Sequence, residues 1–317
     1  LESLMNLQPA PLEILVVDDH SEDTTGDIAR KYGAKVVVPP PIPEGWIGKS
    51  WACHTGALEA SGDYLLFTDA DTVHAPDSLS FAVTELHRQQ AGLVSYVPTH
   101  IVKVFWERFQ GIYHLLLLIA TKAGSRTPKR RGNRRFAIGQ YLLFTREAYD
   151  KVGGHEAIAH RLSEDLALGA AVGEAGMHTA VLVRKNALCV RMYPEGLTSF
   201  FAGWRRSFRD GIGTTGLFGA LEMLAVIGWM LGVVIWGLEA LWLENFERAG
   251  LLGGAYLITA WWVALKQRVL GDFSWGSALT YPVFMLFFVL VSTAVLIDAA
   301  RQKPVNWRGR EIHLSKP

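Results

Sequence analysis

The last third of the chain carries three long apolar runs. Residues 217–243 contain only two charged side chains, Glu222 and Glu239. A helix needs about 20 apolar residues to cross a bilayer, and both this run and residues 279–297 reach that length, whereas residues 251–265 fall short of it. Three such runs in succession favour membrane-spanning helices over the alternative, a buried helical core. We therefore predict a membrane region with two or three spanning helices.

The overall composition fits a chain made of two unlike parts. Of its 317 residues, 50% are hydrophobic and 19% are charged, against about 25% charged in an average soluble protein. The formal net charge is +1. These values exclude a disordered protein, a disulfide-rich secreted module and a generally basic nucleic-acid binder. Cys53 and Cys189 lack the CxxC spacing, which argues against a zinc site and suits a reduced domain that faces the cytosol.

Basic residues flank the apolar runs and bear on the orientation of the chain. Residues 204–209 (WRRSFR) precede the first run, Lys266 and Arg268 follow the second, and residues 301–310 follow the third. The positive-inside bias places such residues in the cytoplasm, which predicts a multi-pass protein of the inner or plasma membrane. Three full crossings would put the basic tail outside. Two crossings would keep it inside if residues 251–265 are re-entrant or lie on the surface, and the sequence leaves both arrangements open.

Two other stretches point to lipid contact. Residues 111–120 (GIYHLLLLIA) are too short to span a bilayer and predict either an interfacial or a buried helix. Residues 122–135 are rich in Lys and Arg and contain no acid, which predicts a loop near anionic lipid head groups. Because no stacking aromatics are interleaved with these cations, we expect no nucleic-acid partner.

Residues 1–212 alternate between strand and helix patterns. Short β-branched and apolar runs predict strands, and the segments between them have helical signals. The strands are expected at residues 12–17, 34–38 and 64–68, and the helices at residues 21–31 and 50–60. This order predicts an α/β fold, an open and mainly parallel sheet with helices on both faces. We divide the chain into this domain, a membrane region at residues 213–300 and a basic tail at residues 301–317.

Two pairs of acids follow predicted strands, where ligands bind in open α/β sheets. Asp69 and Asp71 follow residues 64–68. Carboxylates with this spacing can hold Mg²⁺ or Mn²⁺ against substrate phosphate oxygens. Asp18 and Asp19 follow the first predicted strand and are placed to contact the hydroxyls or base of a nucleotide. The alternative for each pair is a helix cap or a surface loop.

Two further pairs are candidates for chemistry. Glu164 and Asp165 begin a helical pattern, and a carboxylate held near a hydroxyl can act as a general base. Their alternative role is to stabilise the helix N-terminus. Arg205 and Arg206 precede the first apolar run. They could neutralise a diphosphate leaving group, set the membrane orientation, or do both.

The order of these motifs resembles glycosyltransferase family 2, whose members have the GT-A fold. Residues 16–24 (VVDDHSEDT) resemble an acidic segment of that family, residues 67–72 (FTDADT) its metal-binding DxD motif, and residues 163–165 (SED) its ED motif. Residues 45–52 (GWIGKSWA), 139–144 (GQYLLF) and 305–310 (VNWRGR) resemble the membrane-attached branch that acts on carotenoid acids and hopanoid lipids. The resemblance covers nearly the whole chain.

The resemblance implies an inverting, metal-dependent hexosyl transfer. The donor would be a nucleotide-diphosphate sugar, UDP-linked, and the acceptor a lipid-soluble molecule such as a carotenoid acid or a hopanoid. Asp165 would accept the proton of an acceptor hydroxyl, with Glu164 beside it. Asp71, assisted by Asp69, would hold Mg²⁺ or Mn²⁺ against the diphosphate.

The same resemblance assigns the substrate-binding residues. Asp18 and Asp19 would contact the nucleotide, and Lys49 a phosphate, although an exposed loop lysine is the alternative for Lys49. Gln140 and His155 would line the acceptor side.

Two departures from the family pattern qualify the resemblance. The family opens with a strand and a Pro-x-Asn-Glu-like turn that contacts the nucleotide, and we expect a truncated sequence or impaired nucleotide binding because this chain begins in the helix that should follow. The family's QxxRW-type motif is replaced by residues 203–206 (GWRR). The alternative functions are a polyprenyl-phosphate or polysaccharide-type sugar transferase and a catalytically impaired membrane scaffold.

Overall fold

The computed structural model describes residues 1–121, 136–211, 217–301, 305–307 and 310–312. The chain divides into two compact units, one made of Leu1–Pro98 and Gly124–Val190, the other of Thr99–Ala123 and Arg191–Pro317. The basic loop predicted at residues 122–135 lies outside the described residues, as do Lys303 and Arg308 of the basic tail.

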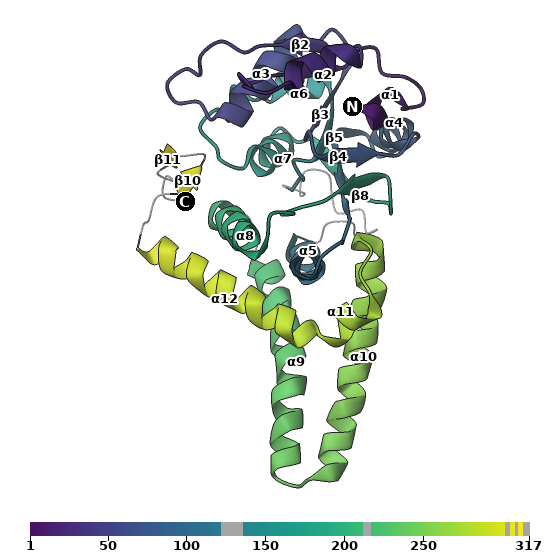
Figure 1. Ribbon diagram of the computed structural model, residues 1–317, viewed down its shortest axis with the longest axis vertical. Helices are drawn as coiled ribbons and strands as arrows, with labels where there is room; N and C mark the ends of the chain where they lie inside the picture. Colours follow the sequence, from purple (N-terminus) through teal and green to yellow (C-terminus); the bar gives the residue numbers. More distant parts are fainter. Residues whose placement is uncertain (122–135, 212–216, 302–304, 308–309, 313–317) are drawn as a thin grey trace. The chain divides into compact units, whose positions relative to one another are not determined.

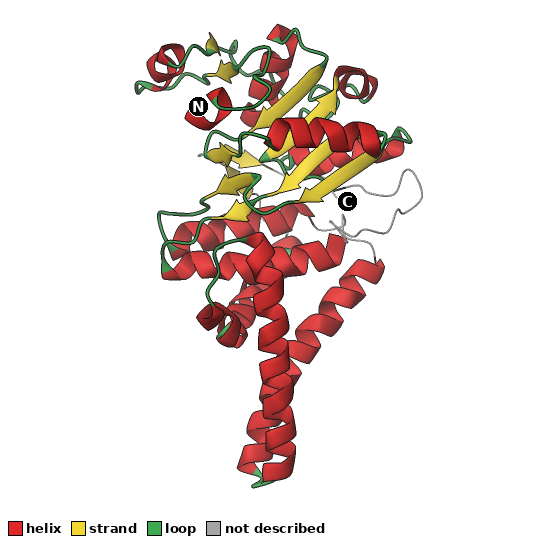
Figure 2. Cartoon of the chain, turned by 90° about the vertical axis from the view of Figure 1, so that its right-hand side faces the viewer, coloured by secondary structure: helices red, strands yellow, loops and turns green. Residues whose placement is uncertain are grey.

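The first unit contains a four-stranded mixed sheet (Figures 1 and 2). Its strands lie in the order β3 (Tyr64–Thr68), β7 (Tyr141–Thr145), β5 (Ala91–Val97) and β8 (His178–Val183). Strand β7 is antiparallel to both β3 and β5, and β5 is parallel to β8. Three of the four strands therefore point in one direction and only β7 runs the other way, as in a mainly parallel sheet with one reversed strand.

Two smaller strand pairs and a set of helices complete the first unit. Strand β1 (Leu15–Val17) is parallel to β2 (Lys35–Val37), and β4 (Thr72–His74) is antiparallel to β9 (Leu188–Val190). The helices are α1 (Glu2–Met5), α2 (Thr25–Lys31), α3 (Gly48–Glu59), α4 (Ser78–Arg88), α6 (Arg146–Lys151) and α7 (Glu164–Glu174).

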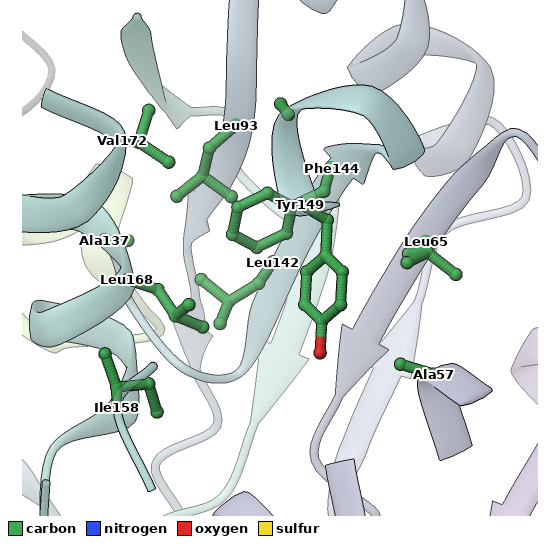
Figure 3. Close-up of a cluster of buried hydrophobic side chains, with 11 residues drawn as sticks. Ala57, Leu65, Leu93, Ala137, Leu142, Phe144, Tyr149, Ile158, Leu168 and Val172 are labelled. Atoms are coloured by element: carbon green, nitrogen blue, oxygen red, sulfur yellow. The ribbon is translucent and has the colours of Figure 1, made fainter. Parts of the chain in front are cut away.

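Strand β7 separates two hydrophobic cores because successive side chains of a strand point to opposite faces of its sheet. Leu142 and Phe144 lie in one core with residues of α6 and α7, as Figure 3 shows. Tyr141 and Leu143 lie in the other core with residues of α4. Helices thus cover both faces of the sheet, and the predicted α/β fold is confirmed.

The second unit is largely helical. Its elements are β6 (Thr99–His100), the 3₁₀ helix η1 (Phe105–Arg108), α5 (Phe109–Thr121), α8 (Leu197–Gly211), α9 (Leu217–Trp242), α10 (Phe246–Leu270), α11 (Trp275–Leu279), α12 (Tyr281–Ala300), β10 (Val305–Trp307) and β11 (Arg310–Ile312). Among the described residues, α9, α10 and α12 are long and apolar enough to cross a membrane, by length and composition. The prediction of apolar helices after the α/β domain is confirmed.

Helix α10 is longer than the apolar run that predicted it. Its N-terminus is capped by Asn245, whose Oδ1 accepts a hydrogen bond from the Arg248 backbone N–H at 3.0 Å. Gly271 ends the helix. The helix therefore continues through polar residues at both ends of the run, and all of residues 246–270 form one candidate span.

Helix α5 settles the choice left open for residues 111–120. Its residues from Phe109 to Leu116 and Ala120 are buried, and it packs against α9, α10 and α12. An interfacial helix would keep one polar face toward water. The structure therefore shows a helix buried within the second unit.

Candidate active site

The turn between β3 and β4 is anchored by two threonine hydroxyls. Thr68 Oγ1 donates to the Gln140 carbonyl oxygen at 2.9 Å and lies 2.9 Å from Thr72 Oγ1. Thr72 Oγ1 is 2.7 Å from the Asp69 carbonyl oxygen and donates to it. These hydrogen bonds join the turn that carries Asp69 to the start of β7, so the position of its carboxylate is set by two strands.

His74 completes this anchor from β4. Its Nε2 atom lies 3.1 Å from both Thr68 Oγ1 and Thr72 Oγ1. Burial lowers the pKa of His74 to about 4, so the ring is neutral at pH 7. Since each hydroxyl already donates elsewhere, Nε2 carries the proton and donates to both.

Lys49, in the first turn of α3, lies between two carboxylates. Its Nζ atom is 2.8 Å from Asp69 Oδ1 and 2.7 Å from Glu164 Oε1. Burial alone would lower the pKa of Lys49, but the charges of Glu164 and Asp69 outweigh that effect and hold it above its usual value. The Glu164 side chain is only 8% exposed, so the ammonium compensates a charge that would otherwise be buried alone.

Asp165 stands beside this ion pair at the N-terminus of α7. Its Oδ2 accepts a hydrogen bond from the Gly139 N–H and its Oδ1 one from the Leu166 N–H, both at 2.8 Å. Burial and the neighbouring charge of Glu164 raise the pKa of Asp165 well above its usual range. A carboxylate that is positioned by two donors and takes up a proton readily has the properties of a general base.

Two residues of the site were not identified as such from the sequence. A Cβ atom on Gly139 would lie 3.2 Å from both Asp165 Oδ2 and Glu164 Oε1, so a larger residue here would crowd both carboxylates. Cys53 follows Lys49 at the (i, i+4) spacing that places two residues on one helix face. Burial, with a contribution from the charge of Glu164, raises the pKa of the Cys53 thiol to about 12. Its helical spacing from Lys49 is the sequence signal that could have placed Cys53 at the site.

Asp69 and Asp71 have the donor chemistry of a site for Mg²⁺ or Mn²⁺. Burial and the charge of Asp69 raise the pKa of Asp71, so a cation between them would relieve an existing repulsion. The described residues contain no cluster of three or more His, Cys, Asp or Glu side chains suited to a metal. Mg²⁺ is commonly bound by one or two carboxylates plus substrate phosphates, and these two aspartates fit such a site.

Asp18 and Asp19 follow β1, as the strand pattern predicts. Hydrogen bonds from Ser21 lower the pKa of Asp18, and the backbone N–H of Ser21 donates to its Oδ1 at 3.0 Å. A Cβ atom on Gly26 would lie 2.9 Å from Asp18 Oδ2. Asp19 Oδ2 would lie 3.7 Å from a Cβ atom on Gly48, which places it near the start of α3.

His155 and Gln140 have different surroundings. His155 is fully buried, its Nδ1 lies 2.8 Å from Tyr149 Oη, and its ring packs edge-on against Phe67. Burial, assisted by the charge of Lys49, lowers the pKa of His155 to about 3. Gln140 contributes its backbone carbonyl to the Thr68 anchor.

Arg205 and Arg206 lie on α8 of the second unit. Arg205 forms an ion pair with Asp298 of α12 through its Nε and Nη2 atoms. The pairing gives Arg205 a partner within its own unit.

A mixed α/β sheet with carboxylates grouped at its strand ends is the architecture of the GT-A class of glycosyltransferases, and here it is followed by helices that are long and apolar enough to cross a membrane. Comparisons with known proteins give the family: the chain belongs to glycosyltransferase family 2. The model of this family, described as glycosyl transferase family 2, matches residues 1–153. The chain is therefore an enzyme of the glycosyltransferase class, as predicted.

Relatives of known name support the same family. The chain is 31% identical to 4,4'-diaponeurosporenoate glycosyltransferase of Staphylococcus aureus strain MRSA252, and the match covers 98% of this chain and 83% of the relative. The enzyme of the same name from strain USA300 is 30% identical over the same shares. Among solved structures, a mannosyltransferase from Pyrobaculum calidifontis in complex with GDP-Man and Mn²⁺ has a TM-score of 0.53 and 18% identity, covering 95% of this chain and 81% of that chain.

Proposed function

We propose that the chain is a membrane-attached, inverting glycosyltransferase that transfers a sugar from a UDP-linked donor to a lipid-like acceptor, such as a carotenoid acid or a hopanoid. The observation that carries the proposal is the bridge from Lys49 to Asp69 and Glu164. It gathers, beside Asp165, groups suited to a diphosphate, to a metal ion and to proton transfer.

The donor would be held by the acids at the strand ends. Asp18 and Asp19 at the end of β1 would contact the nucleotide. Asp71 and Asp69 would hold Mg²⁺ or Mn²⁺, which when bound neutralises charge on the departing diphosphate. Lys49 has its ammonium 2.8 Å from Asp69 and would contact a phosphate oxygen from there.

The transfer is a single displacement at the anomeric carbon. The bond from this carbon to the diphosphate oxygen breaks as a bond to the acceptor oxygen forms on the opposite side, so the configuration inverts. When the acceptor is an alcohol, its proton passes to the Asp165 carboxylate. When the acceptor is a carboxylate, no proton is transferred, and Asp165 would orient the acceptor instead.

The apolar helices and the relatives support the proposed acceptor class. Helices α9, α10 and α12 would attach the enzyme to the bilayer in which a lipid-soluble acceptor resides. The related S. aureus enzyme is named for a carotenoid acid. We further propose that the domain at residues 1–212 faces the cytoplasm from a plasma-membrane anchor at residues 213–300.

The test is a direct product assay on membranes. Membranes that contain the full chain or its Asp165→Asn variant are incubated with labelled UDP-sugars and Mn²⁺, and the extracted lipids are analysed by mass spectrometry. We expect a lipid with an added hexose from the full chain, and little or none from the variant when the acceptor is an alcohol. Label on a polyprenyl phosphate would instead favour that alternative, and an absence of both product and metal-dependent UDP binding would indicate a scaffold.

A further inference from the structure

Helix α12 begins beside the middle of α9 and α10. The Tyr281 hydroxyl donates to the Met230 carbonyl at 3.1 Å, and the Tyr281 ring stacks on Tyr256 with centroids 5.3 Å apart. Met230 lies 13 residues after the start of α9 and 12 before its end, and Tyr256 lies 10 residues after the start of α10 and 14 before its end. At 1.5 Å per residue, the start of α12 is about 15–21 Å from either end of both helices.

The opposite end of α12 lies with the elements at one end of the α9–α10 hairpin. Helix α5 marks this end, because Gly219 near the start of α9 abuts the Ala120 carbonyl and Gln267 near the end of α10 abuts Gly111. We call this the basal end of the hairpin. It consists of the first turn of α9 and the last turn of α10. The loop at residues 243–245 forms the tip.

Contacts along α12 lead from the middle of the hairpin to the basal elements. Phe284 and Phe288 pack against Phe109 and Tyr113 of α5, with ring centroids 4.8 Å and 5.0 Å apart. Further along, Asp298 pairs with Arg205 of α8. Figure 1 shows α12 inclined to the hairpin. The chain thus leaves the basal end at Gly271, reaches the middle of the hairpin at α11, and returns along α12 to the basal end.

The turn at mid-depth has its polar groups satisfied within the protein. The Tyr256 hydroxyl donates to the Leu279 carbonyl oxygen, and the Thr280 hydroxyl donates to the Gly276 carbonyl at 2.8 Å. Ser274 caps α11 by accepting a hydrogen bond from the Ser277 N–H. Non-helical backbone at membrane depth is tolerated only where protein satisfies it in this way.

The charges at the two ends of the hairpin differ. The basal elements α8, α10 and the end of α12 carry six Lys and Arg residues beside the acids Asp210, Asp272 and Asp298, whereas the tip has one Arg beside three Glu residues. The basal cations are Arg205, Arg206, Arg209, Lys266, Arg268 and Arg301, and the tip residues are Glu239, Glu244, Glu247 and Arg248. The positive-inside bias therefore places the basal end in the cytoplasm and the tip outside.

From these contacts we infer that α9 and α10 cross the bilayer and that α11 and α12 form a re-entrant segment, which enters from the basal side and returns to it. The second apolar run is then a true crossing and the third is the re-entrant one. Both ends of the region lie on the same side, so the basic tail meets the positive-inside bias. The inference rests on the proposed membrane attachment and is independent of sugar transfer.

Single cysteines test this topology in the full chain. With Cys53 and Cys189 changed to alanine, one cysteine is introduced at Glu244, Asp272, Thr280 or Arg301, and a membrane-impermeant maleimide is added to right-side-out or inverted vesicles. We expect Glu244→Cys to react from the outside only, and Asp272→Cys and Arg301→Cys from the cytoplasmic side only. Reaction of Arg301→Cys from the outside, or of Thr280→Cys from the outside, would overturn the inference.

A second measurement covers the case in which the cysteine-free chain does not fold. The unaltered chain is fused after Pro317 either to a fluorescent protein that matures only in the cytoplasm or to a phosphatase that is active only outside. We expect fluorescence without phosphatase activity, and active phosphatase would refute the re-entrant segment. If the chain transfers sugar but its tail lies outside, the re-entrant segment is refuted and the proposed function stands. If the tail is cytoplasmic but no sugar is transferred, the proposed function is refuted and the re-entrant segment stands.

Discussion

The Nζ atom of Lys49 lies 2.7 Å from Oε1 of Glu164, and this contact joins the first turn of α3 to the first turn of α7. A second contact from the same ammonium, 2.8 Å to Asp69 Oδ1, extends the pairing to the end of β3. One side chain therefore sets the charge balance around Asp165, the group proposed to accept a proton.

The pH dependence of activity should move in opposite directions when each member of the Lys49–Glu164 pair is neutralised. The Lys49 charge lowers the pKa of Asp165 and the Glu164 charge raises it. A base must be deprotonated, so kcat/KM falls as the pH drops below this pKa. We expect Lys49→Met to move the acid limb to higher pH and Glu164→Gln to lower pH, each by about one unit or more.

The measurement is kcat/KM against pH for the unaltered chain and both variants, with an alcohol acceptor. The control is Lys31→Met, which neutralises an exposed lysine on α2. It should leave the acid limb of the pH profile unchanged. Limbs that move in the same direction would contradict the assignment of the titrating group to Asp165.

Removing the proposed base should stop turnover without loss of donor binding. With an alcohol acceptor, we expect Asp165→Asn to lower kcat by about 10²–10⁴-fold, which is the usual contribution of a general base. The dissociation constant for UDP with Mn²⁺, measured by calorimetry, should stay within about twofold because Asp165 makes no proposed contact with the nucleotide. The control is Asp150→Asn, an exposed carboxylate on α6. Undiminished turnover in Asp165→Asn would exclude the base role.

A methyl group at position 139 should disturb the carboxylates selectively. In Gly139→Ala the new Cβ atom would stand 3.2 Å from both Asp165 Oδ2 and Glu164 Oε1, closer than ordinary van der Waals contact. We expect kcat to fall at least about tenfold, equivalent to about 1.4 kcal/mol of barrier, with an unchanged melting temperature. The matched variant Gly253→Ala has no atom within 4 Å of the new Cβ and should keep full activity.

Metal dependence should be lost when one carboxylate of the pair is neutralised. We expect Asp71→Asn to bind UDP equally with and without Mn²⁺, because a divalent ion bound by few protein ligands loses one of them. Calorimetric titration of UDP in the presence of Mn²⁺ or of a chelator gives the comparison. An Asp71→Asn variant whose UDP affinity still rises with Mn²⁺ would show that Asp71 is not a ligand.

The core drawn in Figure 3 should be sensitive to truncation. Leu142 on β7 is 1% exposed, and Leu142→Ala should destabilise the fold by about 2–5 kcal/mol. Leu58→Ala on α3 is the control, because that side chain is 72% exposed and should change stability by less than about 0.5 kcal/mol. Thermal melting of both variants in the same detergent tests the difference, and equal melting temperatures would contradict the assigned packing.

Much of the fold follows from local patterns in the sequence. Hydrophobic periodicity and turn residues act within a few positions of the chain, so they predict individual strands and helices. These are the strand at residues 64–68, the helices near residues 21–31 and 50–60, and the apolar helices. The candidate acids Asp69, Glu164 and Asp165 were identified in the same way, from their positions beside such elements. Their mutual contacts were not, because Lys49 and Glu164 are far apart in the sequence and meet only when α3 and α7 pack on one sheet.

A repeated pentapeptide shows that the same local sequence can have different burial in two tertiary environments. The sequence YLLFT occurs as β3 and again as β7, and both copies form strands because their residues favour an extended, half-buried backbone. Strand β7 is buried at four of five positions and β3 at one, because β7 lies between two strands and β3 lies at the end of the sheet order. The apolar runs behave alike, because hydrophobicity determines that they become helices. The contacts of Tyr281 with Met230 and of Asp298 with Arg205 decide what α12 packs against, since an apolar surface specifies burial and not the partner that supplies it.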